Sequence, residues 1–454
     1  MTVKIASGPL GPTVQEVLAT DVVPPPACLT VEARDLTLGT ADVPIERYFS
    51  KQWHDREVEH VWRRTWQMAC RLEEIREVGD HIVYEIVHDS LIVVRTGPTE
   101  IRAYINSCLH RGTQLRVTGG NVERFACPVH GFTWALDGTL AKVPAAWDFP
   151  HLVPDEFCLP QARIDTWGGF VFINMDLAAG PLLDYLGVLP EHFAAFRLDE
   201  RWKAAHAAKI MPCNWKLAME AFIESFHIAS THPQTLPYAS DCNTQYDVFD
   251  GPHVNRMVML EGVPSPLLGD LADDEVIAAM RADLPFYGGA PIEVGEGETV
   301  RQKLAERARE KMGRSTGRDM SAVSDSEALD LIQYLVFPNF SPWGGTAVPL
   351  VYRFRPYGDD PERSIMEIMI LFAKAPDGSH PPPAPITWVG IDESWAVAPG
   401  MGSSAVVADQ DTENLKRIQR GLRASHKPGV TLSNYQESRI RHFHRTLDHY
   451  LGET

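Results

Sequence analysis

Two pairs of residues combine a thiol with an imidazole at very short spacing, and both side chains are strong metal ligands. The first pair is Cys108 and His110, and the second is Cys127 and His130. A glycine follows each histidine closely, where a loop that folds back over a metal centre needs a permissive backbone. Each pair therefore predicts a loop that brings one sulfur and one nitrogen ligand to a shared centre.

Two kinds of centre use two cysteines and two histidines. One is a tetrahedral zinc site, and the other is a [2Fe–2S] cluster in which two thiolates hold one iron and two imidazoles hold the other. Zinc fingers usually place both cysteines in one segment and both histidines in another. Here each loop carries one of each, and the iron–sulfur cluster needs this mixing because both loops must reach both irons. The pattern favours the cluster, with zinc as the alternative.

A second set of candidate ligands lies in a segment of helical character. Residues 215–229 contain no Gly or Pro and are mostly good helix formers, which predicts a helix. Glu220, Glu224 and His227 share one face of it because they are spaced four and three residues apart. Pro233 disfavours helical geometry at His232, so we expect the helix to end between the two histidines. Both imidazoles could then serve as ligands of one metal ion.

Both sets closely resemble the motifs of the Rieske non-heme iron ring-hydroxylating oxygenases, in their large (alpha) subunit. The resemblance covers about residues 45–450. It implies that the two Cys-His loops hold a Rieske [2Fe–2S] cluster and that His227 and His232 bind a mononuclear iron. It also implies a role in catalysis for Glu224, which is not a ligand but bridges to His130 of the adjacent subunit.

The sequence departs from the family pattern at two positions. The bridging carboxylate is usually Asp, whereas this chain has Glu224. Glu occurs there in the branch that oxidises carnitine-like quaternary amines, which favours an amine as the alternative substrate. One turn earlier, many ring-dihydroxylating relatives have Asn where this chain has Glu220. That change affects the hydrogen bonding expected near the iron rather than the ligand set.

Iron of this kind needs a third, carboxylate ligand, which the family supplies in a downstream Gln/Glu-Asp element at the start of a helix. Asp411 follows Gln410 and precedes an apolar stripe of helical spacing that begins at Leu415. Asp411 therefore matches best and Asp409 is the runner-up. Either carboxylate could instead cap the helix.

Length and charge limit the classes of protein to consider. The chain has 454 residues, enough for two or three domains. Its net charge of −18 argues against nucleic acid and against anionic membrane surfaces as partners. We find no long apolar run and no signal peptide. The seven cysteines are an odd number in a large chain, which favours reduced thiols and a cytoplasmic location.

The order of the predicted elements suggests an α+β protein with two domains and an N-terminal arm. Residues 1–42 are rich in proline, and we expect either a loose leader or an arm that packs on a neighbouring subunit. Residues 43–165 are expected to form the all-β Rieske domain. Its leading helix, residues 44–63, is expected to pack on the catalytic domain. Residues 166–454 suit a helix-grip catalytic domain with an antiparallel sheet.

The resemblance implies the terminal oxygenase of a multicomponent system. It would use O₂ to hydroxylate an aromatic or hydrophobic ring substrate, once or twice, or to demethylate it oxidatively. No Gly-x-Gly-x-x-Gly follows a predicted strand, so electrons from NAD(P)H are expected to arrive through a separate reductase or ferredoxin. A homotrimer is expected, with or without a small beta subunit. The alternatives are a quaternary-amine monooxygenase and a stand-alone Rieske electron carrier.

Overall fold

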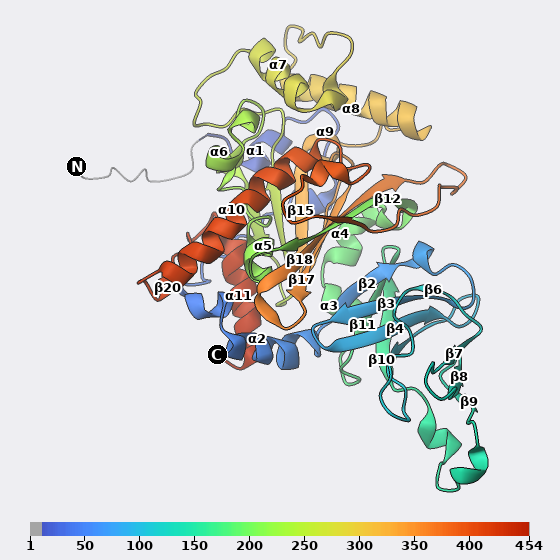
Figure 1. The fold of residues 1–454 in the computed structure, drawn as a ribbon. Helices are drawn as coiled ribbons and strands as arrows, with labels where there is room; N and C mark the ends of the chain where they lie inside the picture. Colours follow the sequence, from blue (N-terminus) through green and yellow to red (C-terminus); the bar gives the residue numbers. More distant parts are fainter. Residues whose placement is uncertain (1–10, 454) are drawn as a thin grey trace. The chain divides into compact units, whose positions relative to one another are not determined.

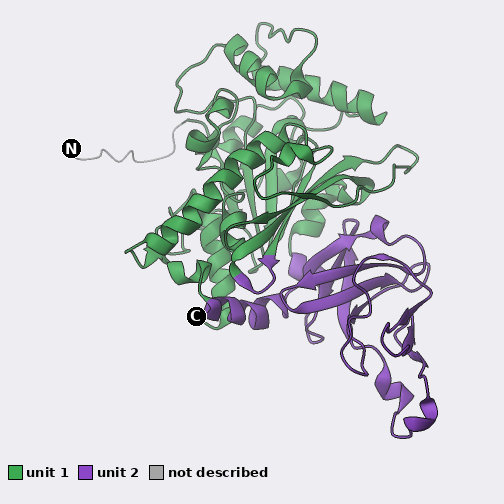
Figure 2. Ribbon diagram, in the orientation of Figure 1, with its two compact units in different colours: residues 1–50, 187–355, 361–454 green, residues 51–186, 356–360 purple. Residues whose placement is uncertain are grey.

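The computed structural model describes residues 11–453, which divide into two compact units (Figures 1 and 2). The larger unit comprises residues up to 50, 187–355 and 361–454, and the smaller unit comprises residues 51–186 and 356–360. None of the helices in residues 11–453 combines the length and the apolar composition that a membrane span requires.

The smaller unit is built on an antiparallel sheet of short strands. Seven strands pair in the order β2-β11-β10-β5-β4-β3-β6, and β7, β8 and β9 form a second sheet. The strands are β2 (Gln67–Arg71), β3 (Asp80–Ile86), β4 (Asp89–Arg95), β5 (Ile101–Ile105), β6 (Gly120–Asn121), β7 (Arg124–Ala126), β8 (Thr133–Ala135), β9 (Leu140–Lys142), β10 (Gln161–Trp167) and β11 (Phe170–Asn174). Strand β4 lies within the sheet and buries four consecutive apolar residues, Leu91 to Val94. The expected all-β domain is present.

The expected boundary between residues 165 and 166 falls inside this sheet. It would cut β10, which pairs with β11 from Arg163–Asn174 to Trp167–Phe170. The smaller unit instead continues to Leu186. The leading helix also differs from the expected span of residues 44–63, because it consists of a 3₁₀ turn (Ile45–Tyr48), α2 (Lys51–Glu57) and a π-turn (Val58–Trp62).

The larger unit is built on an eight-stranded sheet that is antiparallel except for the β12–β19 pair. Its order is β13-β14-β15-β16-β17-β18-β12-β19. The strands are β12 (Arg201–Met211), β13 (Gln245–Val248), β14 (Val254–Met259), β15 (Leu331–Val336), β16 (Phe340–Pro342), β17 (Leu350–Tyr357), β18 (Asp360–Ala373) and β19 (Thr387–Val389). The expected α+β class, with an all-β domain and a mixed catalytic domain, is confirmed.

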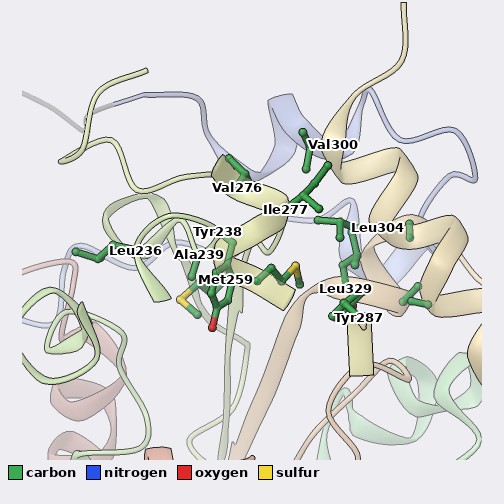
Figure 3. Close-up of a cluster of buried hydrophobic side chains, with 14 of the residues drawn as sticks. Leu236, Tyr238, Ala239, Met259, Val276, Ile277, Tyr287, Val300, Leu304 and Leu329 are labelled. Carbon is green, nitrogen blue, oxygen red and sulfur yellow. The ribbon is translucent and has the colours of Figure 1, made fainter. Parts of the chain in front are cut away.

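Helices of very different length accompany this sheet (Figure 1). The long ones are α7 (Asp273–Asp283), α8 (Val300–Thr316), α10 (Ser404–Ala424) and α11 (Ser438–Leu451), and two short ones are α5 (Trp215–Glu220) and α6 (Ile228–Thr231). Helices α7 and α8 close over a cluster of buried apolar side chains that includes Ile228, Tyr238, Met259 and Leu304 (Figure 3). Ile228 directly follows His227, so this core begins beside the candidate ligands.

Residues 11–42 pack on the larger unit of their own chain, which corrects the expectation of a loose leader; packing on a neighbouring subunit stays a prediction. The Gln15 side chain donates to Gln245 over 2.8 Å. Buried Arg256 donates to the carbonyl oxygens of Cys28 and Val31 over 2.6 and 2.9 Å. Residues 1–10 of the predicted arm lie outside the described residues.

Candidate metal centres

Three side chains of the larger unit converge on one point. The Nε2 atoms of His227 and His232 lie 3.3 and 2.7 Å from the same Asp411 oxygen, and one donor atom of each residue lies within 4.8 Å of the others. His232 and Asp411 are buried and His227 is partly buried. Two imidazole nitrogens and a carboxylate that leave other positions open are the donor set of a non-heme iron site.

The segment that carries the two histidines is not the continuous helix expected from its sequence. Helix α5 ends at Glu220, residues 221–227 form turns, and α6 begins at Ile228. The expected shared helical face of Glu224 and His227 is therefore wrong. The expected helix end between the histidines is correct, because α6 ends at Thr231 and His232 lies at its C-cap. The break brings His227 and His232 together, with ring centroids 5.2 Å apart.

Each histidine is oriented by a hydrogen bond on the ring nitrogen that faces away from Asp411. His227 Nδ1 donates to Glu224 Oε1 over 2.7 Å, and His232 Nδ1 donates to Gln410 Oε1 over 2.8 Å. An amide oxygen and a carboxylate can only accept, so they place the proton on Nδ1. Both Nε2 lone pairs are then free for a metal ion, as in other histidine sites with outer hydrogen-bond partners.

The geometry of helix α10 favours Asp411 rather than Asp409 as the carboxylate ligand. Its buried residues include Ala408, Asp411 and Leu415, spaced three and four apart on one face. Asp409 lies on another face, where it accepts hydrogen bonds from the Ser394 hydroxyl and from the backbone N–H of Trp395 over 2.5 and 2.9 Å. The helix starts at Ser404, so neither aspartate is its N-cap, contrary to one expectation.

The charges around the histidines favour a cation. Although burial opposes the charged form, hydrogen bonds to Asp411 and Glu224 raise the pKa of His227 to about 10. Against the same effect of burial, hydrogen bonds from His227 and His232 hold the pKa of Asp411 below its usual value. A divalent metal ion would satisfy the same negative potential that here favours a proton.

In the smaller unit, the two Cys-His loops have the same backbone hydrogen bonds. The Cys108 N–H donates to the Thr113 carbonyl and the Gly112 N–H to the Cys108 carbonyl, both over 2.8 Å. The Cys127 N–H donates to Phe132 over 2.8 Å and the Gly131 N–H to Cys127 over 3.0 Å. Gly112 and Gly131 adopt φ values of 77° and 76°, the left-handed region that glycine tolerates best.

The side chains of these loops fit an iron–sulfur cluster. Cys108 and Cys127 are buried and free. His110 Nδ1 is buried without a hydrogen-bond partner, which a nitrogen tolerates when it is a ligand. The His110 and His130 rings lie 4.7 Å apart between centroids, while His130 and Val129 are exposed.

Comparison with known families decides the class of protein. Residues 193–453, more than half of the chain, match the family model described as the ring hydroxylating alpha subunit (catalytic domain). The chain belongs to this family. Residues 65–153 match the model of the Rieske [2Fe-2S] domain, which confirms the expected family for both parts of the chain.

Curated relatives of this ring-hydroxylating alpha subunit act on different molecules. Choline monooxygenase of Beta vulgaris is 27% identical over 222 residues, covering 48% of this chain and 49% of that protein. The alpha subunit of biphenyl 2,3-dioxygenase of Rhodococcus jostii is 32% identical over 195 residues, covering 40% and 41%. The oxygenase subunit of Escherichia coli carnitine monooxygenase is 29% identical over 194 residues, covering 42% and 52%. The chain spans about half the length of the curated relatives it matches.

Solved structures extend the likeness over nearly the whole chain. A quaternary ammonium Rieske monooxygenase superposes with a TM-score of 0.65 and 17% identity, covering 92% of this chain and 99% of that one. Naphthalene 1,2-dioxygenase from Rhodococcus sp. gives a TM-score of 0.61 and 23% identity, covering 90% and 94%. At these identities the likeness concerns the fold.

Sequence reasoning missed two groups in this family member. It treated Gln410 only as the residue before Asp411, although Gln410 holds His232. It also gave Glu220 no partner, although the Glu220 carboxylate lies 3.1 Å from the Tyr48 hydroxyl and 2.9 Å from His444 Nε2. The Gln-Asp motif itself could have suggested the first group. No local signal indicates the second, because Tyr48 and His444 come from the two ends of the chain.

Proposed function

We propose that this chain is the terminal oxygenase of a multicomponent Rieske system. His227, His232 and Asp411 would hold a mononuclear iron, and the two Cys-His loops would hold the [2Fe–2S] cluster. When bound, the cluster supplies single electrons and the iron supplies the place where O₂ reacts with substrate. Family membership, together with the convergence of two Nε2 atoms on one buried carboxylate, carries this proposal.

The residues around the iron position have separate tasks in this proposal. Glu224 and Gln410 orient the two histidines through their Nδ1 atoms. Burial of His232 and Asp411 keeps bulk water away from the ligands. Glu224 would also contact His130 of an adjacent subunit, because a carboxylate has more acceptor sites than His227 uses and because His130 is exposed.

The proposed contact between Glu224 and His130 of an adjacent subunit requires an assembly of several chains, and the cluster requires a source of electrons. The chain would form a homotrimer, with or without a small beta subunit, and a separate reductase or ferredoxin would deliver electrons from NAD(P)H. A cytoplasmic location stays a prediction. The main proposed substrate is an aromatic or other hydrophobic ring compound, which the biphenyl and naphthalene dioxygenases among the similar proteins support.

One observation favours the alternative, a quaternary-amine substrate. Glu261 is buried, interacts electrostatically with Tyr238 and Tyr287 of the buried apolar cluster, and has no hydrogen-bond partner for its Oε2. Burial raises the pKa of this carboxyl well above its usual value, and the nearby Asp330 and Asp283 carboxylates add to the effect, which the Arg301 guanidinium only partly offsets. Such a group would gain from a cationic ligand, and choline and carnitine monooxygenases are among the relatives.

The decisive experiment loads the protein with iron under anaerobic conditions and supplies a surrogate reductase. Metal analysis should return three irons per chain, and the reduced protein should give the rhombic EPR spectrum of a Rieske cluster. O₂ uptake is then measured over a panel of aromatic acids, steroids and betaines. A colourless protein that contains zinc would contradict the proposal, and a cluster without mononuclear iron would favour the stand-alone electron carrier.

Glu224→Gln tests the bridge within this function. The variant should keep both metal centres, with an unchanged cluster EPR spectrum, but substrate-dependent O₂ uptake should fall by at least about tenfold. Glu296→Gln, at an exposed carboxylate, is the control. Normal uptake in Glu224→Gln would contradict the bridging role.

A further inference from the structure

Two backbone bonds are missing where the chain leaves helical geometry after α5. In a continuous α-helix, the Ser225 N–H would donate to the Ala221 carbonyl. In the same way, the His227 N–H would donate to the Ile223 carbonyl. In the structure, three of these four groups have other partners, and two of those partners come from distant elements of the larger unit.

Tyr246 of β13 is the new partner of the Ser225 N–H. The Ser225 N–H donates to the Tyr246 hydroxyl over 3.0 Å, and the Ser225 Oγ lies 2.7 Å from the same hydroxyl. Thr244 supports the contact, because its Oγ1 lies 2.6 Å from the Ser225 Oγ. Tyr246 and Ser225 are both buried, so water does not compete for these bonds and the phenol fixes the position of residue 225.

Arg439 of α11 is the new partner of the Ile223 carbonyl. Its Nη1 donates to the Ile223 carbonyl over 3.0 Å and to Gln333 Oε1 over 2.8 Å, and its Nε donates to Asn255 Oδ1 over 2.6 Å. The guanidinium is thereby tied to β14 and β15. It is fully buried, and its Nη2 has no hydrogen-bond partner.

A buried arginine of this kind needs an explanation. Arginine is almost never fully buried unless it is paired, yet among the described residues no carboxylate forms an ion pair with Arg439. Asp247 and Glu224 act on the guanidinium only from a distance, so fold stability alone would favour a neutral residue here, since burying a charge without a direct ion pair is costly. A need for a strong, rigid donor at the Ile223 carbonyl accounts for its presence, because the planar guanidinium holds its donors in a fixed fork.

The result of both contacts is seen at Glu224, which lies between them. With the Ile223 carbonyl occupied, the His227 N–H donates instead to Glu224 Oε2 over 3.1 Å. Glu224 Oε1 accepts from the ring of the same residue over 2.7 Å. One carboxylate therefore fixes both the backbone and the imidazole of His227.

We propose that Arg439 and Tyr246 are positioning residues that hold residues 223–225 out of helical geometry, so that Glu224 can orient His227 toward the metal. This inference rests on the proposed function of Glu224 and His227. Neither residue touches the metal ligands' donor atoms; both act through the backbone on either side of Glu224.

The test uses the full-length protein with its cluster in place and two variants, Tyr246→Phe and Arg439→Lys. Tyr246→Phe removes only the hydroxyl group, and Arg439→Lys replaces the rigid fork of donors by a single flexible ammonium group. The control is Tyr435→Phe, which deletes a neighbouring phenol oxygen that accepts from the Tyr246 backbone N–H over 3.3 Å but does not contact residues 223–225. The readouts are the apparent Fe(II) dissociation constant of the mononuclear site by anaerobic equilibrium dialysis, the EPR spectrum of its nitric oxide adduct, and the rate of cluster re-oxidation in a single turnover.

We expect Tyr246→Phe to raise the Fe(II) dissociation constant about tenfold, as loss of an orienting contact behind a histidine ligand typically does. The nitric oxide adduct should give more than one EPR species, and cluster re-oxidation should slow about tenfold. Tyr435→Phe should match the wild type in all three measurements. If Arg439→Lys does not fold, Tyr246→Phe decides alone.

The outcome for Glu224→Gln separates this inference from the proposed function. If Glu224→Gln re-oxidises its cluster at the wild-type rate, the proposed role of Glu224 fails. If Glu224→Gln is slow while Tyr246→Phe has wild-type iron affinity and a single unchanged EPR species, only the positioning role is overturned.

Discussion

Replacing Glu220 by Gln should change how the stability of the protein depends on pH. Burial raises the pKa of Glu220 to about 8, from 4.5, although the Tyr48 hydroxyl donates to it and Lys216 and Arg47 lie nearby. His444 donates a second hydrogen bond to Glu220. Arg47 can only donate to His444 Nδ1, so the ring proton is on Nε2, which faces Glu220. A Gln oxygen could accept the same two bonds, from Tyr48 and His444.

Whether the free energy of unfolding rises or falls with pH depends on which state, folded or unfolded, binds the proton more tightly. The unfolded chain releases it near pH 4.5 and the folded chain near pH 8, so between these values the folded state binds more protons. The free energy of unfolding then falls as the pH rises. Each pH unit is worth about 1.4 kcal/mol, and the full shift is worth about 5 kcal/mol. Gln does not titrate, so the free energy of unfolding of Glu220→Gln does not fall in this way as the pH rises.

Urea unfolding at about pH 5.5 and about pH 7.5 measures the effect. Between these two conditions the wild type should lose about 3 kcal/mol relative to Glu220→Gln. The infrared carbonyl band of a protonated carboxyl should be present in the wild type near neutral pH and absent from the variant. Glu296→Gln, at an exposed site, should follow the wild type. Parallel pH curves for wild type and Glu220→Gln, together with no such band, would refute the argument from burial.

Two further predictions concern the ligands and their orientation. Asp411→Asn should lose the mononuclear iron while the cluster EPR spectrum is retained, because the amide lacks the charge that balances the metal; Asp409→Asn should keep the iron, and equal iron content in the two variants would contradict the choice of Asp411. Gln410→Leu should weaken Fe(II) binding by about 10–100-fold, because His232 loses the acceptor at Nδ1. Equilibrium dialysis checks this, and Gln234→Leu, which removes only the partner of Gln410, should have a smaller effect.

Local spacing was enough to identify the candidate ligands that the structure brings together, but not their surroundings. The two Cys-His loops and the Gln410-Asp411 element are short motifs, so their residues were identifiable without the fold. The break after Glu220 was not, because residues 215–229 are good helix formers and the groups that break the helix, Tyr246 and Arg439, lie on other elements. Tertiary contacts here override local propensity.

The arm and the unit boundaries were missed for a related reason. Proline-rich composition suggested a loose leader, but residues 11–42 are fixed by side chains such as Arg256 and Gln245, more than 200 positions away along the chain. The boundary depended on a hairpin partner, β11, whose apolar sequence equally suited the start of the next domain. Pairing between strands, rather than their composition, determined where one unit ended.

The division of the chain gives an order to its maturation. Residues 51–186 form the smaller unit almost entirely from one uninterrupted stretch, whereas the larger unit needs segments from both sides of that stretch. During synthesis, the smaller unit can therefore complete its sheet and receive iron and sulfide before the larger unit has been fully synthesised. The mononuclear site must wait for Asp411, which is synthesised long after residue 186. A gene fragment encoding residues 51–186 should consequently yield a brown, folded protein.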